Sequence, residues 1–282
     1  MPATLYLVAT PIGNLEDITL RALRVLKEVD LVAAEDTRHS RKLFAHYGIR
    51  TPLTSYFAHN EKDKGEKLIS VLREGKSVAL ISDAGMPAIA DPGYLLVHRC
   101  RQEGIPVTVL PGACALVTAL ARSGLPSDRF GFEGFLPARA KARREALRQL
   151  QAESRTTVFY EAPHRLFATL QDLATELGEE REVAIARELS KMHEELFYGS
   201  AAAAIEHFGR ERVRGEIVLL VAPAADGKSV RGQAQAGSVE DSLRKLMAEG
   251  MRPRQAAKQV AKEFGLPADE VYRLWLEVKD KQ

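Results

Sequence analysis

The sequence predicts an α/β protein of two domains followed by a small helical module. Three observations lead to this prediction. Short apolar runs alternate with amphipathic segments over residues 1–122, a pattern typical of a parallel sheet with helices on its faces. A second series of such runs occupies residues 123–223. After a small, polar stretch at 224–237, the apolar residues of 238–282 recur at helical spacing.

The first domain begins with a strand and continues as alternating strands and helices. Its amphipathic helices include Thr19–Val29 and Glu66–Glu74. The predicted strands are the short apolar runs Leu5–Ala9, Leu31–Ala34, Ser77–Ile81 and Pro106–Leu110. Runs that are apolar on both faces indicate strands covered by helices on both sides. In such sheets the ligand site lies in the loops at the carboxyl ends of the strands.

The second domain begins near Ser123–Pro126, where the first series of runs ends. Helices are predicted near Ala140–Glu153 and Arg165–Leu177. The predicted strands are Phe130–Phe135, Thr156–Tyr160, Glu182–Arg187 and Glu216–Val221. These predicted strands and helices are interleaved along the chain, which again predicts an α/β domain.

The C-terminal module follows a stretch, 224–237, that has the small, polar composition of a flexible linker. Ser238–Asp241 is suited to cap a helix that runs to about Glu249, and Pro253 suits the first turn of a second helix. A third helix runs to about Val278. Three short helices with a glycine turn resemble a helix-turn-helix module, and a helical cap without a ligand is the alternative.

The composition excludes wholesale disorder, because 45% of the 282 residues are hydrophobic and 28% are charged. Forty Lys and Arg residues stand against 38 Asp and Glu residues, a formal net charge of +2. This balance gives no general basic field, so any contact with nucleic acid must come from local patches.

The two cysteines, Cys100 and Cys114, form at most one bridge and lack the spacing of a zinc site. We expect both to be reduced core thiols and expect no bound metal.

The N-terminal residues enter a strand-like run without a basic leader, and no run approaches the ~20 apolar residues of a membrane span. We therefore expect a cytoplasmic protein with no membrane segment.

The glycine pattern excludes two common nucleotide-binding motifs. No two of the 20 glycines lie two positions apart, so the dinucleotide fingerprint G-x-G-x-x-G is absent. Gly-Lys-Ser triplets begin at Gly75 and Gly227, but Ser70 and Ala222 stand where a phosphate loop requires its first glycine.

The segment Ile81–Tyr94 predicts a ligand-binding loop after a buried strand. Its glycines, prolines and small residues let main-chain groups approach a ligand closely. Asp83 and Asp91 offer carboxylates for ribose hydroxyls or an ammonium group, and they would repel a pyrophosphate. A cationic nucleoside without phosphates suits such a loop. The alternative is that both aspartates only cap helices and turns.

Five segments together resemble the ribosomal RNA small subunit methyltransferase I family, a branch of the tetrapyrrole-methylase-like proteins. They follow the order of the family within residues 4–221, and the C-terminal helices resemble the family's appended helix-turn-helix. The segments are Val8–Asn14, Ala34–Arg38, Ser82–Gly93, Tyr160–Arg165 and Arg187–Lys191. The resemblance implies a two-domain tetrapyrrole-methylase-like fold, a homodimer, and transfer of methyl from S-adenosyl-L-methionine to the 2′-hydroxyl of a cytidine in 16S rRNA.

The resemblance also implies which residues bind S-adenosylmethionine. In the first domain they belong to the loops after the strands, and in the second they belong to segments that close on the cofactor. The implied cofactor-binding residues are Pro11, Asp83, Gly85, Met86, Ile89, Ala113, Cys114, Tyr160, Leu189, Gly215, Glu216 and Ile217.

Methyl transfer to a ribose hydroxyl needs alignment, a group that takes the proton, and a cation for the developing alkoxide. The candidates are the charged residues of the family segments: Glu35, Asp36, Arg38, Glu161, His164, Arg187, Glu188 and Lys191. We favour Lys191 and Glu188 for the chemistry, with Asp36, Arg38 and His164 as further catalytic candidates. Strand alternation should place Glu188 on the opposite face from Arg187 and Leu189. A helix cap at Asp36 and a surface ion pair at Glu188 are the alternatives.

A local basic segment runs from Arg139 to Arg155, with six basic and two acidic residues. It could bind the phosphates of RNA, although such runs are usually solvated helix faces. The RNA-binding residues predicted from this segment and the family motifs are Arg38, Arg139, Lys141, Arg143, Arg144 and Arg165. The expected partner is 16S rRNA or the small ribosomal subunit.

Two other functions stay open from the sequence. A methyltransferase of the same fold could act on a small tetrapyrrole, which would require neither the basic segment nor the helical module. A regulator could sense a metabolite with its α/β part and bind DNA with its C-terminal helices.

Overall fold

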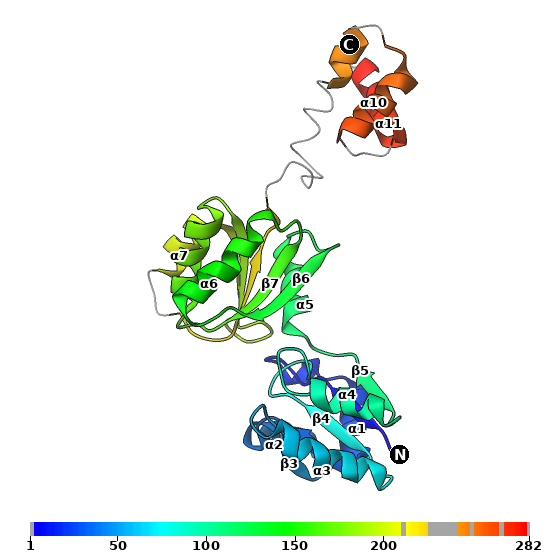
Figure 1. The fold of residues 1–282 in the computed structure, drawn as a ribbon, viewed down its shortest axis with the longest axis vertical. Helices are drawn as coiled ribbons and strands as arrows, with labels where there is room; N and C mark the ends of the chain where they lie inside the picture. Colours follow the sequence, from blue (N-terminus) through cyan, green and yellow to red (C-terminus); the bar gives the residue numbers. More distant parts are fainter. Residues whose placement is uncertain (1–2, 210–212, 225–241, 249–250, 265–267, 281–282) are drawn as a thin grey trace. The chain divides into compact units, whose positions relative to one another are not determined.

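The computed structural model describes residues 3–209, 213–224, 242–248, 251–264 and 268–280 (Figure 1). The chain forms two compact units. The larger unit, 1–151 with 155–222, contains both sheets, and the smaller comprises 152–154 with 223–282. The division at residue 223 falls immediately before the stretch that the sequence assigns to a linker.

The first sheet has five parallel strands in the order β3-β2-β4-β1-β5. They are β1 Leu5–Val8, β2 Leu31–Ala34, β3 Leu53–Ser55, β4 Val78–Ile81 and β5 Val107–Leu110. The parallel sheet confirms the predicted fold class, and four of its strands fall where the apolar runs predict them. The sequence did not predict β3, because three half-buried residues at a sheet edge are too few to give a pattern.

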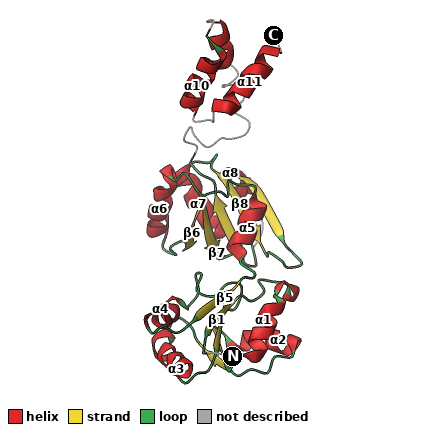
Figure 2. Cartoon of the chain, turned by 90° about the vertical axis from the view of Figure 1, so that its right-hand side faces the viewer, coloured by secondary structure: helices red, strands yellow, loops and turns green. Residues whose placement is uncertain are grey.

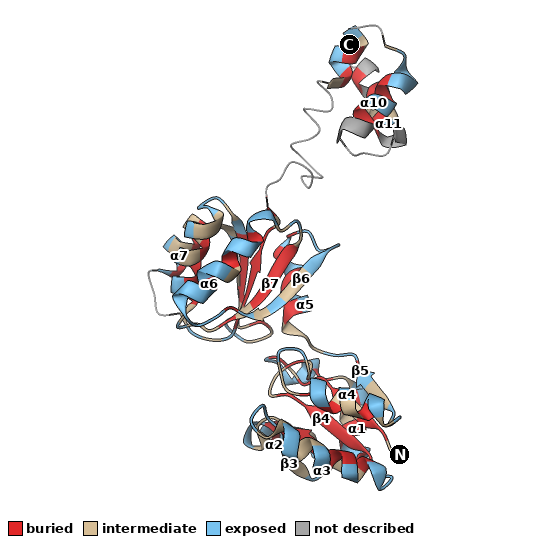
Figure 3. Ribbon diagram, in the orientation of Figure 1, coloured by how far each residue is buried: buried red, intermediate tan, exposed pale blue. Residues whose placement is uncertain are grey.

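Two pairs of helices cover the two faces of this sheet. The core beneath α1 (Leu20–Glu28) and α2 (Thr37–Tyr47) includes Val25, Leu43 and Phe44. The core beneath α3 (Glu61–Arg73) and α4 (Tyr94–Gln102) includes Leu68 and Leu96. Every residue of β4, the central strand, is buried, which accounts for its unbroken apolar run (Figure 3).

The topology gathers loops at the centre of one sheet edge. From β1 the chain crosses to β2 through α1 on one face, whereas from β4 it crosses to β5 through α4 on the other face. These two connections lie on opposite faces and run in opposite directions, so the direction of winding reverses between the neighbouring strands β1 and β4. A crevice at such a point is the usual ligand site of an open α/β sheet.

The second sheet is mixed, with strand order β6-β7-β10-β8-β9. Only β6 and β7 are parallel, and the other neighbours are antiparallel. The strands are β6 Phe130–Phe135, β7 Thr156–Glu161, β8 Glu182–Arg187, β9 Glu195–Ser200 and β10 Ile217–Val221. The sequence did not predict β9, an edge strand of intermediate and exposed residues without a buried face.

Helices also cover both faces of the second sheet. On one face lie α6 (Ala140–Arg148), the short helix η2 (Gln149–Ala152), α7 (Leu166–Leu177) and α8 (Ala201–Phe208). Figure 2 shows α5 (Ala115–Ser123) on the opposite side of the sheet from α6. Leu116, Ala119 and Leu120 of α5 pack with residues of β7, β8 and β10. This helix therefore shares the core of the second sheet, whereas the sequence assigned it to the first domain.

The smaller unit contains a helix at 242–248, α10 (Pro253–Phe264) and α11 (Ala268–Asp280). Pro253 begins α10, as its fixed backbone angle suggests. Ala257, Val260 and Trp275 belong to the buried core of this unit, together with Leu243 and Leu246. The predicted cap at 238–241 and the predicted linker from residue 225 onward lie outside the described residues.

Within the described residues, none of the helices combines the length and apolar composition that a bilayer span needs.

Candidate active site

Hydrogen bonds join three loops at the carboxyl edge of the first sheet. The loops after β1 and β4 pair through Thr10 and Gly85, whose main-chain N–H···O distances are 2.9 and 3.0 Å. The Thr10 hydroxyl also donates to the carbonyl of Ser82 at 3.1 Å. The loop after β2 joins them, since the amide of Asp36 donates to Oδ1 of Asp83 at 3.0 Å. The edge is thus held in one arrangement before any ligand binds.

The loop from Ser82 to Gly93 has an unusual backbone. Ala88 and Ala90 have φ angles of 65° and 62°, a left-handed conformation that costs free energy for residues other than glycine. The end of the loop is fixed by Glu61 of α3, which accepts the amide of Gly93 at 3.0 Å. Strain that is held by its surroundings in this way is common where a loop contacts a ligand.

A cavity of about 380 Å³, here called the first cavity, lies against these loops. The other part of its wall comes from the second sheet, at the ends of β6 and β7 and at the start of β10. The residues that line it are Ile12, Glu35, Asp83, Ala84, Met86, Ile89, Asp91, Cys114, Ala115, Phe135, Tyr160, Glu161, Ala162, Pro163, Leu189, Gly215, Glu216, Ile217 and Val218. Its volume is that of an ordinary small-molecule site.

Of the five carboxylates that line the first cavity, Glu161 and Glu216 have basic partners, whereas Glu35, Asp83 and Asp91 form no ion pair among the described residues. Burial raises the pKa of Asp91 to about 6, and the neighbouring charge of Glu35 adds to the shift. The pKa of Glu35 is raised as well, by burial and by the charge of Asp83. Carboxylates that repel one another in this way are stabilised by a cation placed between them. The first cavity therefore favours a positively charged ligand and disfavours a phosphate.

Replacing Asp91 by asparagine should stabilise the unliganded protein at neutral pH. The folded-state pKa lies above the unfolded value, so the stabilisation due to protonated Asp91 is complete below pH 4 and is lost as the pH rises through about 6. We expect Asp91→Asn to raise the free energy of unfolding by about 1–2 kcal/mol at pH 8, allowing for solvent screening of a half-buried group. Urea unfolding at pH 8 and pH 4 measures this. An equal difference at both pH values would contradict the assignment.

The opposite wall of the first cavity is apolar and aromatic. The ring of Tyr160 packs edge-to-face against Phe132 and Phe135, with centroid distances of 5.0 and 5.7 Å. Burial, together with the charge of Cys114, raises the pKa of Tyr160 to about 12, so its hydroxyl stays neutral. Cys114 lines the cavity, whereas Cys100 is fully buried, so only one of the two thiols is a core residue as predicted.

A second cavity, of about 470 Å³, adjoins the first. Four residues line both: Ile12, Asp83, Ala84 and Glu216. The remaining lining residues of the second cavity come from the loops after β1, β4 and β8 and from α2. They are Thr10, Pro11, Gly13, Leu15, His39, Ser40, Lys42, Leu43, Ser82 and Lys191.

Lys191 lies in the second cavity between two carboxylates. Its Nζ is 2.7 Å from Oε1 of Glu188 and 3.2 Å from Oε2 of Glu216. Burial tends to lower the pKa of Lys191, but the hydrogen bond to Glu188 and the charge of Glu216 outweigh it, so the pKa is raised. Burial likewise opposes ionisation of Glu188, and its bonds to Lys191 and to the Glu216 amide leave its pKa lowered. Lys191 is therefore a cation and Glu188 an anion at neutral pH.

The segment that carries Lys191 does not continue the strand. Strand β8 ends at Arg187, and Glu188 and Ser190 have φ angles of 53° and 66°. The predicted alternation of side chains across this segment is therefore wrong, because two left-handed residues turn the chain. Leu189 between them is buried with Ile12 and Val218. A strained turn thus brings Lys191 to the cavity.

Two glycines allow this turn to approach its neighbours. A Cβ atom on Gly13 would lie 2.5 Å from Cγ of Lys191 and 2.7 Å from the carbonyl oxygen of Leu189. Gly215 has a φ of 91°, and a Cβ there would overlap the side chain of Glu188. Side chains at either position would displace the Glu188–Lys191 turn.

Of the twelve residues predicted to bind the cofactor, nine line the first cavity. Pro11 lines the second cavity, and Gly85 and Ala113 line neither of the two. Gly85 instead holds the loop through its bridge to Thr10, and a Cβ on it would lie 3.7 Å from the carbonyl of Ala113.

The predicted catalytic residues Asp36, Arg38 and His164 do not line the two cavities. Asp36 caps α2 by accepting the amide of Arg38 at 2.8 Å, and the two side chains form an ion pair at 2.8 Å. The ion pair holds the pKa of Asp36 well below its usual range, and Arg38 is 85% exposed. Neither residue lines the two cavities, and the helix cap that the sequence offers as the alternative for Asp36 is present in the structure. His164 lines a different cavity with Phe167 and Arg214.

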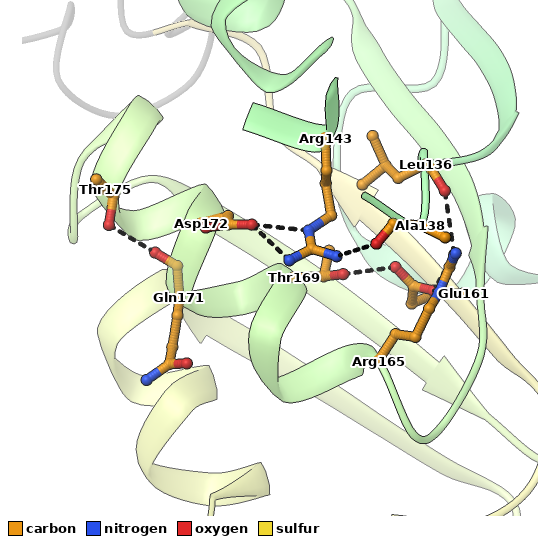
Figure 4. Close-up of polar contacts among 9 residues, drawn as sticks. All are labelled: Leu136, Ala138, Arg143, Glu161, Arg165, Thr169, Gln171, Asp172 and Thr175. Carbon is orange, nitrogen blue, oxygen red and sulfur yellow. Dashed lines mark hydrogen bonds and ion pairs between the residues drawn. The ribbon is translucent and has the colours of Figure 1, made fainter. Parts of the chain in front are cut away.

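Two of the predicted RNA-binding arginines are structural (Figure 4). Arg143 is only 6% exposed and forms an ion pair with Asp172 of α7 at 2.6 Å. Arg165 binds the buried carboxylate of Glu161 at 2.6 Å and the carbonyl of Leu136 at 3.2 Å. Their guanidinium groups are occupied within the fold, so the prediction that they contact RNA is wrong. The other residues of that set in α6 and at its cap are exposed: Arg139, Lys141 and Arg144.

Neighbouring arginines in α6 give a matched test of this distinction. Arg143→Ala should lower the free energy of unfolding by about 3 kcal/mol, because it leaves the Asp172 carboxylate, which is only 15% exposed, without its partner. Arg144→Ala removes an exposed side chain and should change stability by less than about 0.5 kcal/mol. Denaturant unfolding of both variants measures this, and equal effects would show that the Arg143 ion pair contributes nothing.

Several residues that line the cavities are absent from the site predicted from the sequence. Glu35 directly follows the buried strand β2, and Asp91 lies in the same loop as Asp83. His39 and Lys42 of α2 were not considered. The sequence does indicate a basic surface here, because residues 37–47 contain Arg38, Arg41 and Lys42 and no acidic residue.

Among the described residues, no three His, Cys, Asp or Glu side chains are arranged to bind a metal ion.

The fold and the loop-lined cavity define a methyltransferase of the tetrapyrrole methylase class. Residues 4–205 match the family model of tetrapyrrole (corrin/porphyrin) methylases, and residues 233–279 match that of the RsmI C-terminal HTH domain. A solved uroporphyrin-III C-methyltransferase from Thermus thermophilus, complexed with S-adenosyl homocysteine, shares the fold. It has a TM-score of 0.55 at 22% identity, covering 78% of this chain and 97% of that one.

Relatives that match over nearly the whole chain identify the family within this class. The chain is 48% identical over 275 residues to ribosomal RNA small subunit methyltransferase I of Synechocystis sp., with 98% of each chain covered. It is 47% identical over 276 residues to the Escherichia coli O157:H7 protein of the same name, covering 97% of this chain and 94% of that one. The chain belongs to the ribosomal RNA small subunit methyltransferase I family.

Proposed function

We propose that this protein transfers a methyl group from S-adenosylmethionine to the 2′-hydroxyl of a cytidine in the 16S rRNA of the small ribosomal subunit. The observation that carries the proposal is the pair of adjoining cavities, one lined by carboxylates and the other by Lys191. Two reactants can meet where the cavities share Asp83 and Glu216. The names of the full-length relatives support ribosomal RNA as the methyl acceptor.

The first cavity has the chemistry that S-adenosylmethionine requires. When bound, this cofactor supplies an electrophilic methyl group on a positively charged sulfur. Glu35, Asp83 and Asp91 complement its positive charges, and the wall around Tyr160 accepts a flat apolar ring. The small residues and main-chain groups of the Ser82–Gly93 loop allow close approach. The predicted cofactor residues that line this cavity are retained in the proposal.

Lys191 acts in this proposal as a cation and not as a base. Its raised pKa keeps it protonated, so it stabilises the oxygen of the hydroxyl as negative charge develops there. Glu188 lines neither of the two cavities and holds Lys191 in place, which makes it a positioning residue. Glu216 lines both cavities, and its side chain is 70% exposed. We therefore assign its carboxylate as the group that accepts the proton from the ribose hydroxyl.

The proposal keeps Arg139, Lys141 and Arg144 as contacts for rRNA phosphates outside the cavities, because their side chains are exposed. Cytoplasmic location and a homodimeric state, which the family resemblance implies, also belong to it. The helical unit of residues 242–280 would assist docking on the ribosomal subunit.

The test is methyl transfer from isotope-labelled S-adenosylmethionine to small ribosomal subunits and to free 16S rRNA that lack the modification. Nucleoside mass spectrometry after digestion should find the label in 2′-O-methylcytidine. Label on a base, or no label on RNA together with methylation of a tetrapyrrole, would refute the proposal. The same digest shows whether the free RNA or the assembled subunit is the better substrate.

A further inference from the structure

The geometry points to the second cavity and the adjoining face of α2 as the binding site for the acceptor nucleotide and its phosphates. His39 and Lys42 are assigned as the residues that contact the RNA backbone there. This inference rests on the proposed function and extends it, because it identifies where the RNA strand lies relative to the methyl donor.

The second cavity combines the surfaces that a nucleotide needs. Ile12, Leu15 and Leu43 give it an apolar wall, and Leu15 is 38% exposed although it is hydrophobic. His39, Lys42 and Lys191 give it hydrogen-bond donors and positive charge. An apolar surface suits the face of a base or sugar, and cations suit phosphate oxygens.

Helix α2 presents an unbalanced basic surface beside this cavity. Its inner side is fixed by Ser40, Leu43 and Phe44, which are buried, so the residues between them face outward. Arg38 is paired with Asp36, but Arg41 and Lys42 are exposed and have no ion pair among the residues that the structure describes. Cations that have no acidic partner within the protein can neutralise phosphate groups of RNA.

The first cavity is less suited to this purpose, because Glu35 and Asp91 line it and not the second cavity, and their charges would repel a phosphodiester. Burial raises the pKa of Asp91, with the charge of Glu35 adding to the shift, and burial and the charge of Asp83 raise the pKa of Glu35. The RNA backbone should therefore approach from the side of Lys191 and α2. This places the reacting hydroxyl at the shared wall, near Glu216.

The test compares His39→Ala, Lys42→Ala and the double variant with Lys67→Ala. Lys67 is an exposed lysine of α3, the helix that packs on the opposite face of the first sheet. The double variant should raise KM for small-subunit RNA about tenfold with little change in kcat or in the affinity for S-adenosylmethionine. Lys42→Ala should lower the slope of log RNA affinity against log salt by about 1, and Lys67→Ala should change neither quantity.

Filter binding to small-subunit RNA tests the surface whether or not methyl transfer occurs, so it separates this inference from the proposed function. If wild-type protein transfers no methyl to RNA, the proposed function fails. If wild-type protein methylates RNA but the α2 variants keep the KM and salt slope of Lys67→Ala, only the inference fails. A loss of S-adenosylmethionine affinity in the double variant would also overturn it.

Discussion

Replacing Lys191 by methionine should lower kcat for RNA methylation by about 10²–10³-fold and leave the affinity for S-adenosylmethionine within a few-fold of wild type. Removing one preorganised donor to a developing oxyanion typically has an effect of this size. Lys191 lines the second cavity and not the first, so the loss should fall on turnover and not on cofactor binding. Methionine keeps the unbranched stem that packs against Gly13.

The control for Lys191→Met is Lys191→Arg, which keeps the charge but changes the geometry. Because Glu188 and Glu216 both pair with Nζ, partial activity is expected from arginine and almost none from methionine. Single-turnover kinetics with labelled cofactor measure the chemical step, and calorimetry measures the cofactor affinity. A kcat for Lys191→Met within threefold of wild type would remove Lys191 from the chemistry.

Replacing Gly13 by alanine should nearly abolish activity, although it adds a single methyl group. The new Cβ would meet Cγ of Lys191 at 2.5 Å and the carbonyl oxygen of Leu189 at 2.7 Å, and the second contact is to backbone. The Glu188–Lys191 turn must therefore shift, and displacement of a catalytic group by about 1 Å can cost 10²-fold in rate. Overpacking should also lower the free energy of unfolding by about 1–3 kcal/mol.

Gly65→Ala in α3 is the matched control, because a Cβ there meets no heavy atom within 4 Å. A glycine in the middle of a helix is destabilising, so this variant should gain about 0.5–1 kcal/mol and keep full activity. Thermal unfolding and the methyl-transfer assay distinguish the two variants. If Gly13→Ala keeps wild-type kcat, the close approach of the turn to Gly13 has no role in catalysis.

The sequence predicts a strand well where every residue of that strand is buried. The buried runs Val78–Ile81 and Ile217–Val221 have no exposed residue, so their apolar character identifies them as central strands. Strands β3 and β9 were missed because each lies at a sheet edge and has no residue in the buried class. The packing partner of α5 could not be predicted either, since an apolar helix stripe does not show which sheet it covers.

The candidate site was predictable in its loops but not in its ion pairs. Asp83 and Met86 follow a buried strand, and strand ends of a parallel sheet gather at one edge, so their position follows from the fold. Arg143 and Arg165 looked like surface charges because their partners are distant in the chain or hidden by burial. Arg143 pairs with Asp172, 29 residues away, and the Glu161 carboxylate that holds Arg165 has no exposed surface.

The most direct test of this account is a crystal structure of the protein with S-adenosylhomocysteine. We expect the ligand in the first cavity, in contact with Met86, Tyr160 and Leu189, with its sulfur facing the wall shared with the second cavity. Ligand density at any other place, with the first cavity empty at saturating concentration, would contradict it.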